Sequence, residues 1–278
     1  MPAGNAKGIL MIRIILAGAT GWVGRALVPA IDKAADLELV AALSRNHAGL
    51  DLGVALGGKP SGVPVFARIE EALATPADVL IDYTKPNVVK AHALAALKGG
   101  LNVVIGTSGL GAADYAELDA EALAHKRGLL AAGNFSITAT LLKRFTLEAA
   151  KYVADVELID YASATKPDAP SGTGRELAEA LAGVRQGATS RPVSEVVGVP
   201  ETRGGAFGEG AHEVRVHALR LPSFVLGVEA IFGAPDERLT IRHDAGSSAA
   251  PYVAGTLLAT RKVSGWTGVR RGLDTLLD

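Results

Sequence analysis

Two short segments of this sequence combine residue types that bind anions. The first, here called the lysine segment, runs from Lys166 to Gly174 and places Ser171, Gly172 and Thr173 directly before a predicted helix. Backbone N–H groups at a helix start, two hydroxyl groups and one ammonium can together hold a carboxylate or a phosphate. The same pattern also fits a helix N-cap beside a surface lysine, so the segment alone leaves both interpretations open.

The second segment, here called the glycine loop, runs from Gly18 to Gly24 and has the sequence GATGWVG. It follows a β-branched run at residues 12–16 and precedes apolar residues at helical spacing at 22–31. Its spacing, GxxGxxG, departs from GxGxxG, but it still permits a tight turn and close approach of the backbone to a pyrophosphate. Because the loop joins a strand to a helix, we predict that a nicotinamide dinucleotide binds here. The loop residues expected to contact it are Gly18, Thr20, Gly21, Trp22 and Val23.

The second predicted strand, residues 37–43, is followed by Ser44 and Arg45. An enzyme that favours NAD usually has an acidic residue here, which binds both ribose hydroxyls. A guanidinium can instead bind a 2′-phosphate through two parallel hydrogen bonds, and serine adds another without repulsion. We therefore predict that NADPH is preferred over NADH. The alternative is that Arg45 is an ordinary solvated surface residue.

Missing residues exclude two enzyme classes that share this type of loop. Extended short-chain dehydrogenases need a tyrosine four residues before a lysine to donate a proton, and Tyr161 and Lys166 are one position too far apart. Semialdehyde dehydrogenases use a cysteine nucleophile, and the chain has no cysteine. The absence of cysteine also excludes disulfides and thiolate zinc sites.

The composition narrows the possible partners. The net charge is −1, which provides no field for nucleic acid or an anionic membrane surface, so any anion site must be local. A chain without cysteine fits a reducing compartment, and we expect a cytoplasmic protein. No apolar run is long enough to span a bilayer, and no cluster has the spacing of metal ligands. Residues 1–10 lack the apolar core of a signal peptide and are expected to form a tail before a fold that begins at Met11.

The elements that must position these residues alternate between strands and helices as far as Asn134. Repeated βα units predict an α/β protein with a Rossmann-like, doubly wound parallel sheet. The expected strands are residues 12–16, 37–43, 79–83, 101–105 and 129–132. The expected helices between the later strands are residues 69–74, 88–98 and 113–126.

After Asn134 the pattern changes to that of a smaller α+β domain with a mixed sheet. Its expected elements are helix 137–153, strand 156–161, helix 176–183 and β-rich stretches at 212–219, 224–232 and 237–243. Helices at 249–262 and 272–277 are expected to return to the first domain. We therefore predict a dinucleotide-binding domain, residues 11–134 completed by 245–278, and a substrate-binding and oligomerisation domain, residues 135–244. The edge of such a sheet can pair with another copy, so we predict a homo-oligomer.

Together these motifs resemble the dihydrodipicolinate (4-hydroxy-tetrahydrodipicolinate) reductase family. The family's signature ends in a lysine, any residue and then DAPSGT, as the lysine segment does, and GATGWVG is similar to its cofactor loop. The other matching segments are Asp82–Thr84, Gly106–Gly109, Asn134–Ser136 and Leu239–Asp244. The resemblance extends from Met11 to the C-terminus.

The resemblance implies a reductase of the lysine (diaminopimelate) pathway. Such an enzyme transfers a hydride from NAD(P)H to a small, cyclic, imine-like dicarboxylate and yields tetrahydrodipicolinate. It implies a tetramer in which the substrate carboxylate is held by Lys166, Ser171, Gly172 and Thr173. The residues implied to contact the cofactor are Tyr83, Thr84, Gly106, Thr107, Ala132, Asn134 and Phe135.

The chain departs from the family at the expected proton donor. Family members typically have an acidic residue, a variable residue and two histidines before the lysine, whereas the sequence here is Asp160, Tyr161, Ala162 and Ser163. A histidine expected within residues 225–229 is also missing. Loss of a positioned acid lowers a rate by about two to four orders of magnitude. The six histidines offer no clear replacement: we expect His92, for example, to be a solvated residue on a helix surface.

Three interpretations remain open. In the first, the chain is a family reductase in which Lys166, Tyr161 or water donates the proton. In the second, it is a divergent paralogue that reduces a different imine or enamine, with space for another side chain created by Ala162 and Ser163. In the third, it is a catalytically silent NADPH-binding scaffold. The intact glycine loop and lysine segment argue against the scaffold, because a purely structural role requires neither an anion site nor Arg45.

Overall fold

The computed structural model describes residues 11–166, 168–184, 205–208 and 212–277. The chain divides into two compact units, Met1–Ser136 with Ala249–Asp278 and Ile137–Ser248. The tail expected at residues 1–10 lies outside the described residues. No helix in the described ranges has the length and apolar character needed to cross a membrane.

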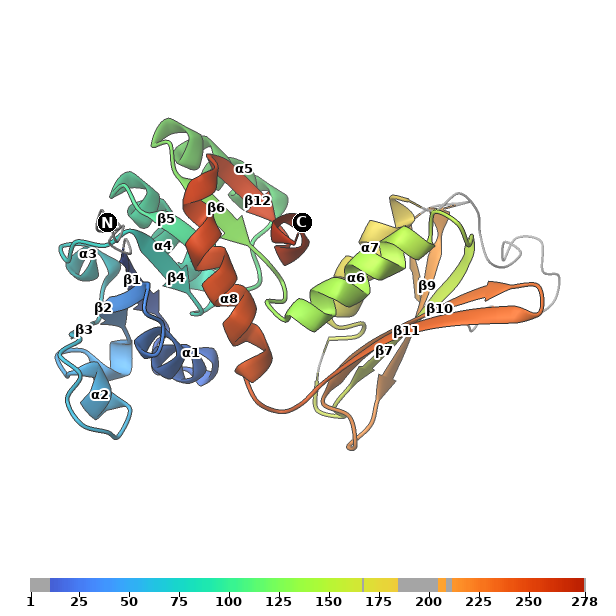
Figure 1. Cartoon of the computed structure of the whole chain (residues 1–278), viewed down its shortest axis with the longest axis horizontal. Coiled ribbons are helices and arrows are strands. Elements are labelled where there is room, and N and C mark those ends of the chain that lie inside the picture. Colours follow the sequence, from blue (N-terminus) through green and yellow to red (C-terminus); the bar gives the residue numbers. More distant parts are fainter. Residues whose placement is uncertain (1–10, 167, 185–204, 209–211, 278) are drawn as a thin grey trace, which may run out of the picture. The chain divides into compact units, whose positions relative to one another are not determined.

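A seven-stranded parallel sheet forms the centre of the first unit (Figure 1). Its strands, in chain order, are β1 (Ile12–Ala17), β2 (Leu37–Leu43), β3 (Val65–Phe66), β4 (Val79–Asp82), β5 (Asn102–Ile105), β6 (Gly128–Ala131) and β12 (Gly268–Arg271). In space the order is β12-β6-β5-β4-β1-β2-β3, so the direction of winding reverses between β1 and β4. Ligands of doubly wound sheets bind outside the carboxyl ends of the strands at this reversal. The predicted Rossmann-like fold class is confirmed.

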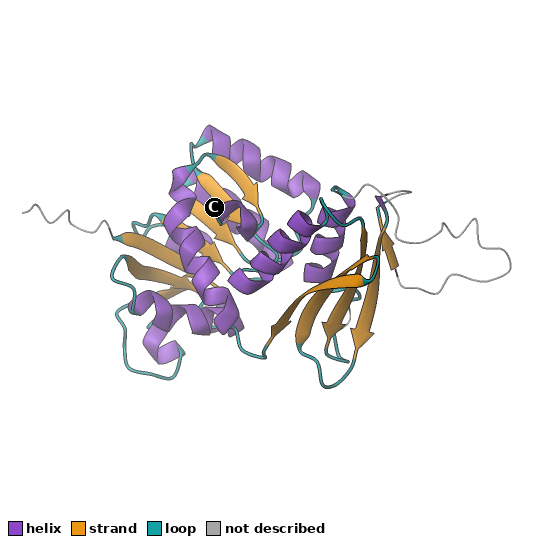
Figure 2. Cartoon of the chain, turned by 45° about the vertical axis from the view of Figure 1, so that its right-hand side comes forward, coloured by secondary structure: helices purple, strands orange, loops and turns teal. Residues whose placement is uncertain are grey.

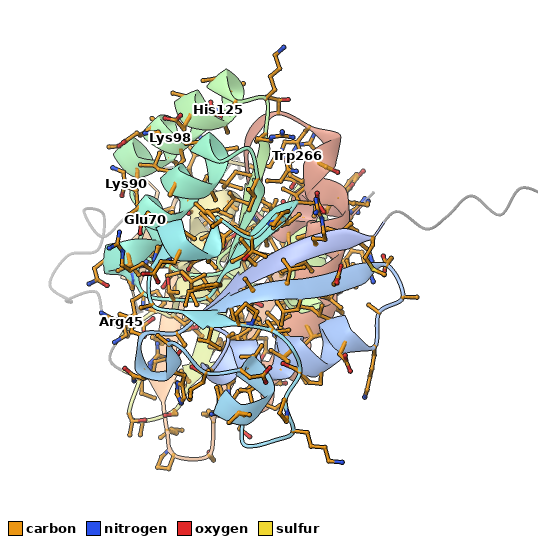
Figure 3. The ribbon with its side chains drawn as sticks, turned by 90° about the vertical axis from the view of Figure 1, so that its left-hand side faces the viewer. Arg45, Glu70, Lys90, Lys98, His125 and Trp266 are labelled. Atoms are coloured by element: carbon orange, nitrogen blue, oxygen red, sulfur yellow. The ribbon has the colours of Figure 1, made fainter. Side chains whose placement is uncertain are left out.

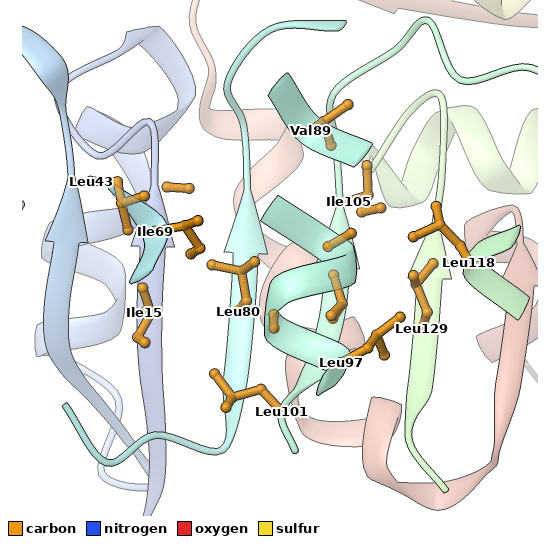
Figure 4. Packing of buried hydrophobic residues seen from close by; sticks show 14 of the residues in the cluster. Ile15, Leu43, Ile69, Leu80, Val89, Leu97, Leu101, Ile105, Leu118 and Leu129 are labelled. Carbon is orange, nitrogen blue, oxygen red and sulfur yellow. The ribbon is translucent and has the colours of Figure 1, made fainter. Parts of the chain in front are cut away.

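Helices cover the sheet of the first unit because its strands are apolar on both faces. Neighbouring strand residues such as Ile14 and Ile15 point to opposite faces, and both are fully buried. The helices are α1 (Trp22–Asp32), α2 (Leu52–Ala55), α3 (Ile69–Ala72), α4 (Pro86–Lys98), α5 (Ala112–Ala124) and α8 (Ala250–Lys262). One apolar cluster joins the strands to α3, α4 and α5 (Figure 4), while α1 packs against α8.

A five-stranded mixed sheet forms the second unit, in the order β11-β10-β7-β9-β8 (Figure 2). Its strands are β7 (Asp155–Ala162), β8 (Gly205–Phe207), β9 (Val214–Arg220), β10 (Leu226–Ala234) and β11 (Glu237–Ala245). The central strand β7 runs parallel to β9 and antiparallel to β10. Helices α6 (Ile137–Ala149) and α7 (Gly172–Ala182) share an apolar core with this sheet, which includes Leu158, Leu177 and Phe232.

Two local expectations were wrong. The helix expected at 272–277 is a short 3-10 turn, Leu273–Leu276, and it follows a strand, β12, that the sequence did not predict. In β12 the arginines Arg270 and Arg271 are exposed, so the strand lacks the apolar run of a buried parallel strand. The helix expected from residue 176 begins at Gly172, because the Ser171 side chain accepts a hydrogen bond from Gly174 N and caps the helix there.

Candidate active site

The glycine loop lies between β1 and α1 and depends on its glycines. Gly18 has φ of +84°, and a Cβ there would collide with the backbone carbonyl of Tyr83. A Cβ on Gly24 would overlap the backbone of the loop itself. Gly21 is the N-cap of α1, with no side-chain cap and no acidic residue in the first turn. The first-turn N–H groups of α1 can therefore bind an anion.

We expect Gly18→Ala to weaken NADPH binding at least tenfold and to lower the melting temperature. The substitution forces a side chain into a positive-φ conformation, which costs about 1–3 kcal/mol, and pushes the Tyr83 carbonyl away. The matched control is Gly57→Ala, because Gly57 also has positive φ, +87°, but has no neighbour within 4 Å of the added Cβ. Thermal denaturation and fluorescence titration measure both effects. Unchanged NADPH affinity in Gly18→Ala would show that the loop does not hold the cofactor.

A pocket of about 420 Å³, here called the larger pocket, lies at the carboxyl ends of β1, β2 and β4. It is lined by Gly18, Thr20, Gly21, Trp22, Leu43, Ser44, Arg45, Asn46, Ala67, Tyr83, Thr84, Lys85, Val88 and His92. This set contains the predicted contacts of the glycine loop up to Trp22, the Ser44–Arg45 pair, and Tyr83 and Thr84. It also contains Lys85, the N-cap of α4, and Val88 and His92 from α4 itself, none of which the sequence predicted to bind the cofactor. None of the described residues that line the pocket is acidic.

Ser44 and Arg45 lie at the end of the larger pocket next to β2. The hydroxyl groups of Thr20 and Ser44 are 2.8 Å apart, and this hydrogen bond joins the glycine loop to the end of β2. Arg45 is exposed (Figure 3) and forms no ion pair within the part of the chain that the structure describes. Its guanidinium is therefore available to an anionic group bound in the pocket.

A second pocket of about 190 Å³, here called the smaller pocket, is rich in aromatic rings. It is lined by Trp22, Val23, Tyr83, Gly106, Gly133, Asn134, Phe135 and Tyr252. The rings of Trp22 and Tyr252 pack edge to face with their centroids 5.6 Å apart. Those of Tyr83 and Phe135 pack in the same way with centroids 5.9 Å apart. Trp22 and Tyr83 line both pockets, so one elongated ligand can contact both. Of the predicted cofactor residues, Thr107 and Ala132 line neither.

A buried carboxylate lies beneath the larger pocket at the end of β4. Asp82 is fully buried and accepts hydrogen bonds from Thr84 N (2.9 Å) and Thr84 Oγ1 (2.6 Å), from Thr107 Oγ1 (2.9 Å) and from His92 Nδ1 (2.8 Å). The expectation that His92 is a solvated surface residue was therefore wrong, since its side chain is only 16% exposed. The sequence pattern places His92 on α4 but does not show that α4 packs beside the end of β4.

In the second unit, the lysine segment is fastened to the end of β7 by another buried carboxylate. Asp160 is fully buried and accepts hydrogen bonds from Ser171 N at 2.8 Å, from Ser171 Oγ and from Arg220 Nη2 at 2.8 Å. Arg220 also donates to the carbonyl oxygen of Asp168 at 2.6 Å. The hydroxyl hydrogen of Ser171 is committed to Asp160, so in this conformation the Ser171 side chain anchors the segment.

The remaining groups of the lysine segment are more accessible. Lys166 Nζ lies 2.8 Å from Asp168 Oδ1, with both side chains partly exposed. The hydrogen bond from Lys166 holds the pKa of the Asp168 carboxyl below its usual value. Gly172 is exposed and Thr173 partly exposed in the first turn of α7, where Gly174 N already donates to the Ser171 side chain. An anion can therefore reach the Lys166 ammonium and the exposed start of α7 at Gly172.

Tyr161, the other predicted proton donor, is held within the sheet. Its hydroxyl donates to Glu229 Oε2 at 2.8 Å, and the Arg242 guanidinium lies 4.7 Å from its ring centre. Burial, followed by the bond to Glu229, raises the pKa of Tyr161, so the phenol is a weaker acid than usual. Its catalytic role stays a prediction. At the positions of the family's histidines, Ala162 is fully buried and Ser163 Oγ bonds to a neighbouring hydroxyl. Neither side chain can titrate near neutral pH.

No group of three or more His, Asp or Glu side chains within the described ranges has the arrangement of a metal site.

Comparisons with known proteins identify the family of this chain. Residues 12–135 match the family model "Dihydrodipicolinate reductase, N-terminus", and residues 138–277 match "Dihydrodipicolinate reductase, C-terminus". The chain belongs to the dihydrodipicolinate reductase family. The resemblance of its motifs is thereby confirmed, and with it the prediction of a pyridine-nucleotide-dependent oxidoreductase.

Relatives within the dihydrodipicolinate reductase family match this chain along almost its whole length. The 4-hydroxy-tetrahydrodipicolinate reductase of Desulfitobacterium hafniense is 38% identical over 269 residues, which cover 96% of this chain and 99% of the relative. That of Trichormus variabilis is 37% identical over 276 residues, covering 96% and 98%. The dipicolinate-bound dihydrodipicolinate reductase from Paenisporosarcina sp. TG-14 has a TM-score of 0.81 at 29% identity, covering 96% and 99%. An amine dehydrogenase from Mycobacterium smegmatis, 16% identical with a TM-score of 0.62, shares the fold.

Proposed function

We propose that this chain is a 4-hydroxy-tetrahydrodipicolinate reductase of the lysine pathway that prefers NADPH. One observation carries the proposal: this family member has both an intact lysine segment and a glycine-loop pocket whose described lining residues include no acid. The names of the full-length relatives support the substrate, and the dipicolinate bound to the Paenisporosarcina protein supports a planar dicarboxylate as the ligand.

The residues of the first unit fit a dinucleotide. Gly18 and Gly24 have no room for a Cβ, which keeps the glycine loop in its tight turn, and the uncapped start of α1 would supply N–H donors to a pyrophosphate. Ser44 and Arg45 would bind the ribose and its 2′-phosphate, and the aromatic lining of the smaller pocket suits a flat nicotinamide ring. When bound, the nicotinamide supplies the hydride.

The lysine segment would bind the substrate and supply a proton. In the net reaction a hydride enters the substrate ring, a hydroxide leaves, and one proton converts that hydroxide to water. The ammonium of Lys166 can pair with a substrate carboxylate, and as the one cationic side chain of its segment it can also donate a proton. To do either it must weaken its bond to Asp168, 2.8 Å away. Gly172 and Thr173 would donate to the same carboxylate from the first turn of α7.

We expect Arg45→Ala to raise the Kd for NADPH about tenfold to a hundredfold and to leave the Kd for NADH within about twofold. The variant loses a charged hydrogen bond to a phosphate that only NADPH carries. Lys59→Ala is the control, because Lys59 is an exposed cation that does not line the pocket. Equal catalytic efficiency with NADH and NADPH in the unaltered protein would refute the preference.

Ala162 and Ser163, in place of the family's histidines, favour a second candidate function, the reduction of a different imine or enamine. The test follows NADPH oxidation by the loss of the absorbance of the reduced nicotinamide. The substrates are freshly generated 4-hydroxy-tetrahydrodipicolinate and a panel of small cyclic imino acids. Turnover of the first substrate supports the proposal, and turnover of the panel alone supports the paralogue. NADPH binding without turnover of any substrate would identify a silent scaffold and refute both.

We also propose a cytoplasmic homo-oligomer, a tetramer by family resemblance. The support for assembly is β11, whose residues are largely exposed and which lies at an edge of the described sheet, with β10 as its neighbouring strand. Light scattering after size-exclusion chromatography gives the number of copies directly, and a monomer at micromolar concentration would contradict the tetramer.

A further inference from the structure

The Asp82–His92 pair fixes which nitrogen of His92 carries a proton. Asp82 is fully buried, and its carboxylate can only accept hydrogen bonds when ionised. It accepts three from Thr84 and Thr107 and one from His92 Nδ1 at 2.8 Å. Nδ1 must therefore carry the hydrogen, and in the neutral ring Nε2 is left with a free lone pair.

His92 Nε2 is placed to meet a ligand. His92 lines the larger pocket, and Nε2, on the far side of the ring from Asp82, has no hydrogen-bond partner among the described residues. Because the Asp82 carboxylate is fixed at the end of β4, its bond to Nδ1 holds the imidazole of His92 on α4 in one orientation. An asparagine at position 92 could also donate to Asp82 and would keep all four hydrogen bonds between β4, α4 and their neighbours. The second ring nitrogen of His92, Nε2, is therefore not needed for the fold.

The neighbours of His92 indicate which part of a dinucleotide it would meet. Val88 lies one turn earlier on α4 and lines the same pocket, together with Leu43 and Ala67, which makes this part of the lining apolar. In dinucleotide-binding folds the adenosine ribose lies at the end of the second strand, here next to Ser44 and Arg45. A flat purine ring attached to that ribose would fit among these apolar side chains.

We infer that His92 recognises the purine of the cofactor, with Nε2 accepting a hydrogen bond from the 6-amino group of adenine while Asp82 holds the ring in place. This inference rests on the proposed dinucleotide site and extends it to the base. An acceptor in this position selects an amino group over a carbonyl oxygen, because two acceptors facing each other form no hydrogen bond and repel. His92 is then a specificity-determining residue, and Asp82 is its positioning residue.

The test compares two nucleotides that differ only at this group, NADPH and its deaminated analogue, in which hypoxanthine replaces adenine and a 6-oxo oxygen replaces the amino group. Binding is measured without substrate, from the quenching of tryptophan fluorescence, since Trp22 lines both pockets and the chain has only one other tryptophan. We expect the unaltered protein to bind the analogue at least about tenfold more weakly than NADPH.

The variant His92→Asn isolates Nε2, because an asparagine amide can reproduce the Nδ1–H bond to Asp82 but has no group at the position of Nε2. We expect it to bind both nucleotides with Kd values within about twofold of each other. The matched control, His125→Asn, alters the C-cap residue of α5, whose Nε2 lies 2.8 Å from Glu121 Oε1, and should keep the preference for NADPH.

Equal affinity of the unaltered protein for the two nucleotides would overturn the inference and leave the proposed function standing, and this comparison does not depend on whether the variant folds. A change of the NADPH-to-NADH ratio in His92→Asn, with the adenine preference intact, would also overturn it, because His92 would then contact the 2′-phosphate. Failure of the unaltered protein to bind NADPH at all would instead refute the proposed function.

Discussion

Replacing Lys166 by alanine is expected to lower kcat/KM for 4-hydroxy-tetrahydrodipicolinate by about three orders of magnitude. The variant loses a cation that pairs with the substrate carboxylate and the acid that we propose donates the proton. Neither Ala162 nor Ser163 can take over the proton transfer, and the phenol of Tyr161 is bound to Glu229. Steady-state kinetics with NADPH measure the loss, and the Kd of NADPH should stay within about twofold.

Two further variants make the result on Lys166 specific. Lys166→Arg keeps the charge but is a far weaker acid, so it should restore part of the substrate affinity and little of kcat. Lys151→Ala, which removes an exposed lysine paired with Glu148, should leave both constants unchanged. If Lys166→Ala keeps more than about a third of the original kcat/KM, the substrate does not bind at the lysine segment.

Replacing Asp160 by alanine is expected to destabilise the second unit by about 3–5 kcal/mol. Asp160 is fully buried, and its loss leaves the guanidinium of Arg220, which is 16% exposed, without its counter-charge. It also removes both hydrogen bonds that hold Ser171 at the start of α7. The midpoint of urea unfolding, followed by circular dichroism, measures the change in the free energy of unfolding.

The control for this prediction is Asp155→Ala at the exposed start of the same strand, β7, which should cost less than about 0.5 kcal/mol. Comparing the two variants shows whether the loss of stability comes from removing a buried carboxylate or from removing any carboxylate of β7. An Asp160→Ala variant as stable as the Asp155→Ala variant would show that the buried pair does not hold the lysine segment in place.

The sequence predicts the first unit well where local patterns determine the structure. The strand before Gly18, the glycine loop and the helix after it follow from side-chain type and spacing alone. The residues at the carboxyl ends of β2 and β4 could also be placed, because the order of a doubly wound sheet brings these ends together. The structure accordingly groups Ser44, Arg45 and Thr84 around one pocket.

The parts that the sequence could not predict depend on tertiary packing. His92 looks like any polar residue on an exposed helix until α4 is packed beside β4 and Asp82 proves to be buried. Ser171 fits an anion ligand by its position, but the carboxylate that engages its hydroxyl comes from β7, eleven residues earlier in the chain. The sequence around one residue of such a contact does not show which distant residue it will meet. These contacts therefore could not be predicted from local patterns.

A crystal structure with NADP⁺ and pyridine-2,6-dicarboxylate bound tests the central claim most directly. The account predicts that one carboxylate of the dicarboxylate lies within hydrogen-bond distance of Lys166 Nζ and the first-turn N–H groups of α7. It also predicts that the pyrophosphate lies against the glycine loop and the 2′-phosphate against Arg45. A dicarboxylate bound away from the lysine segment, or a dinucleotide bound away from Gly18 and Gly21, would contradict it.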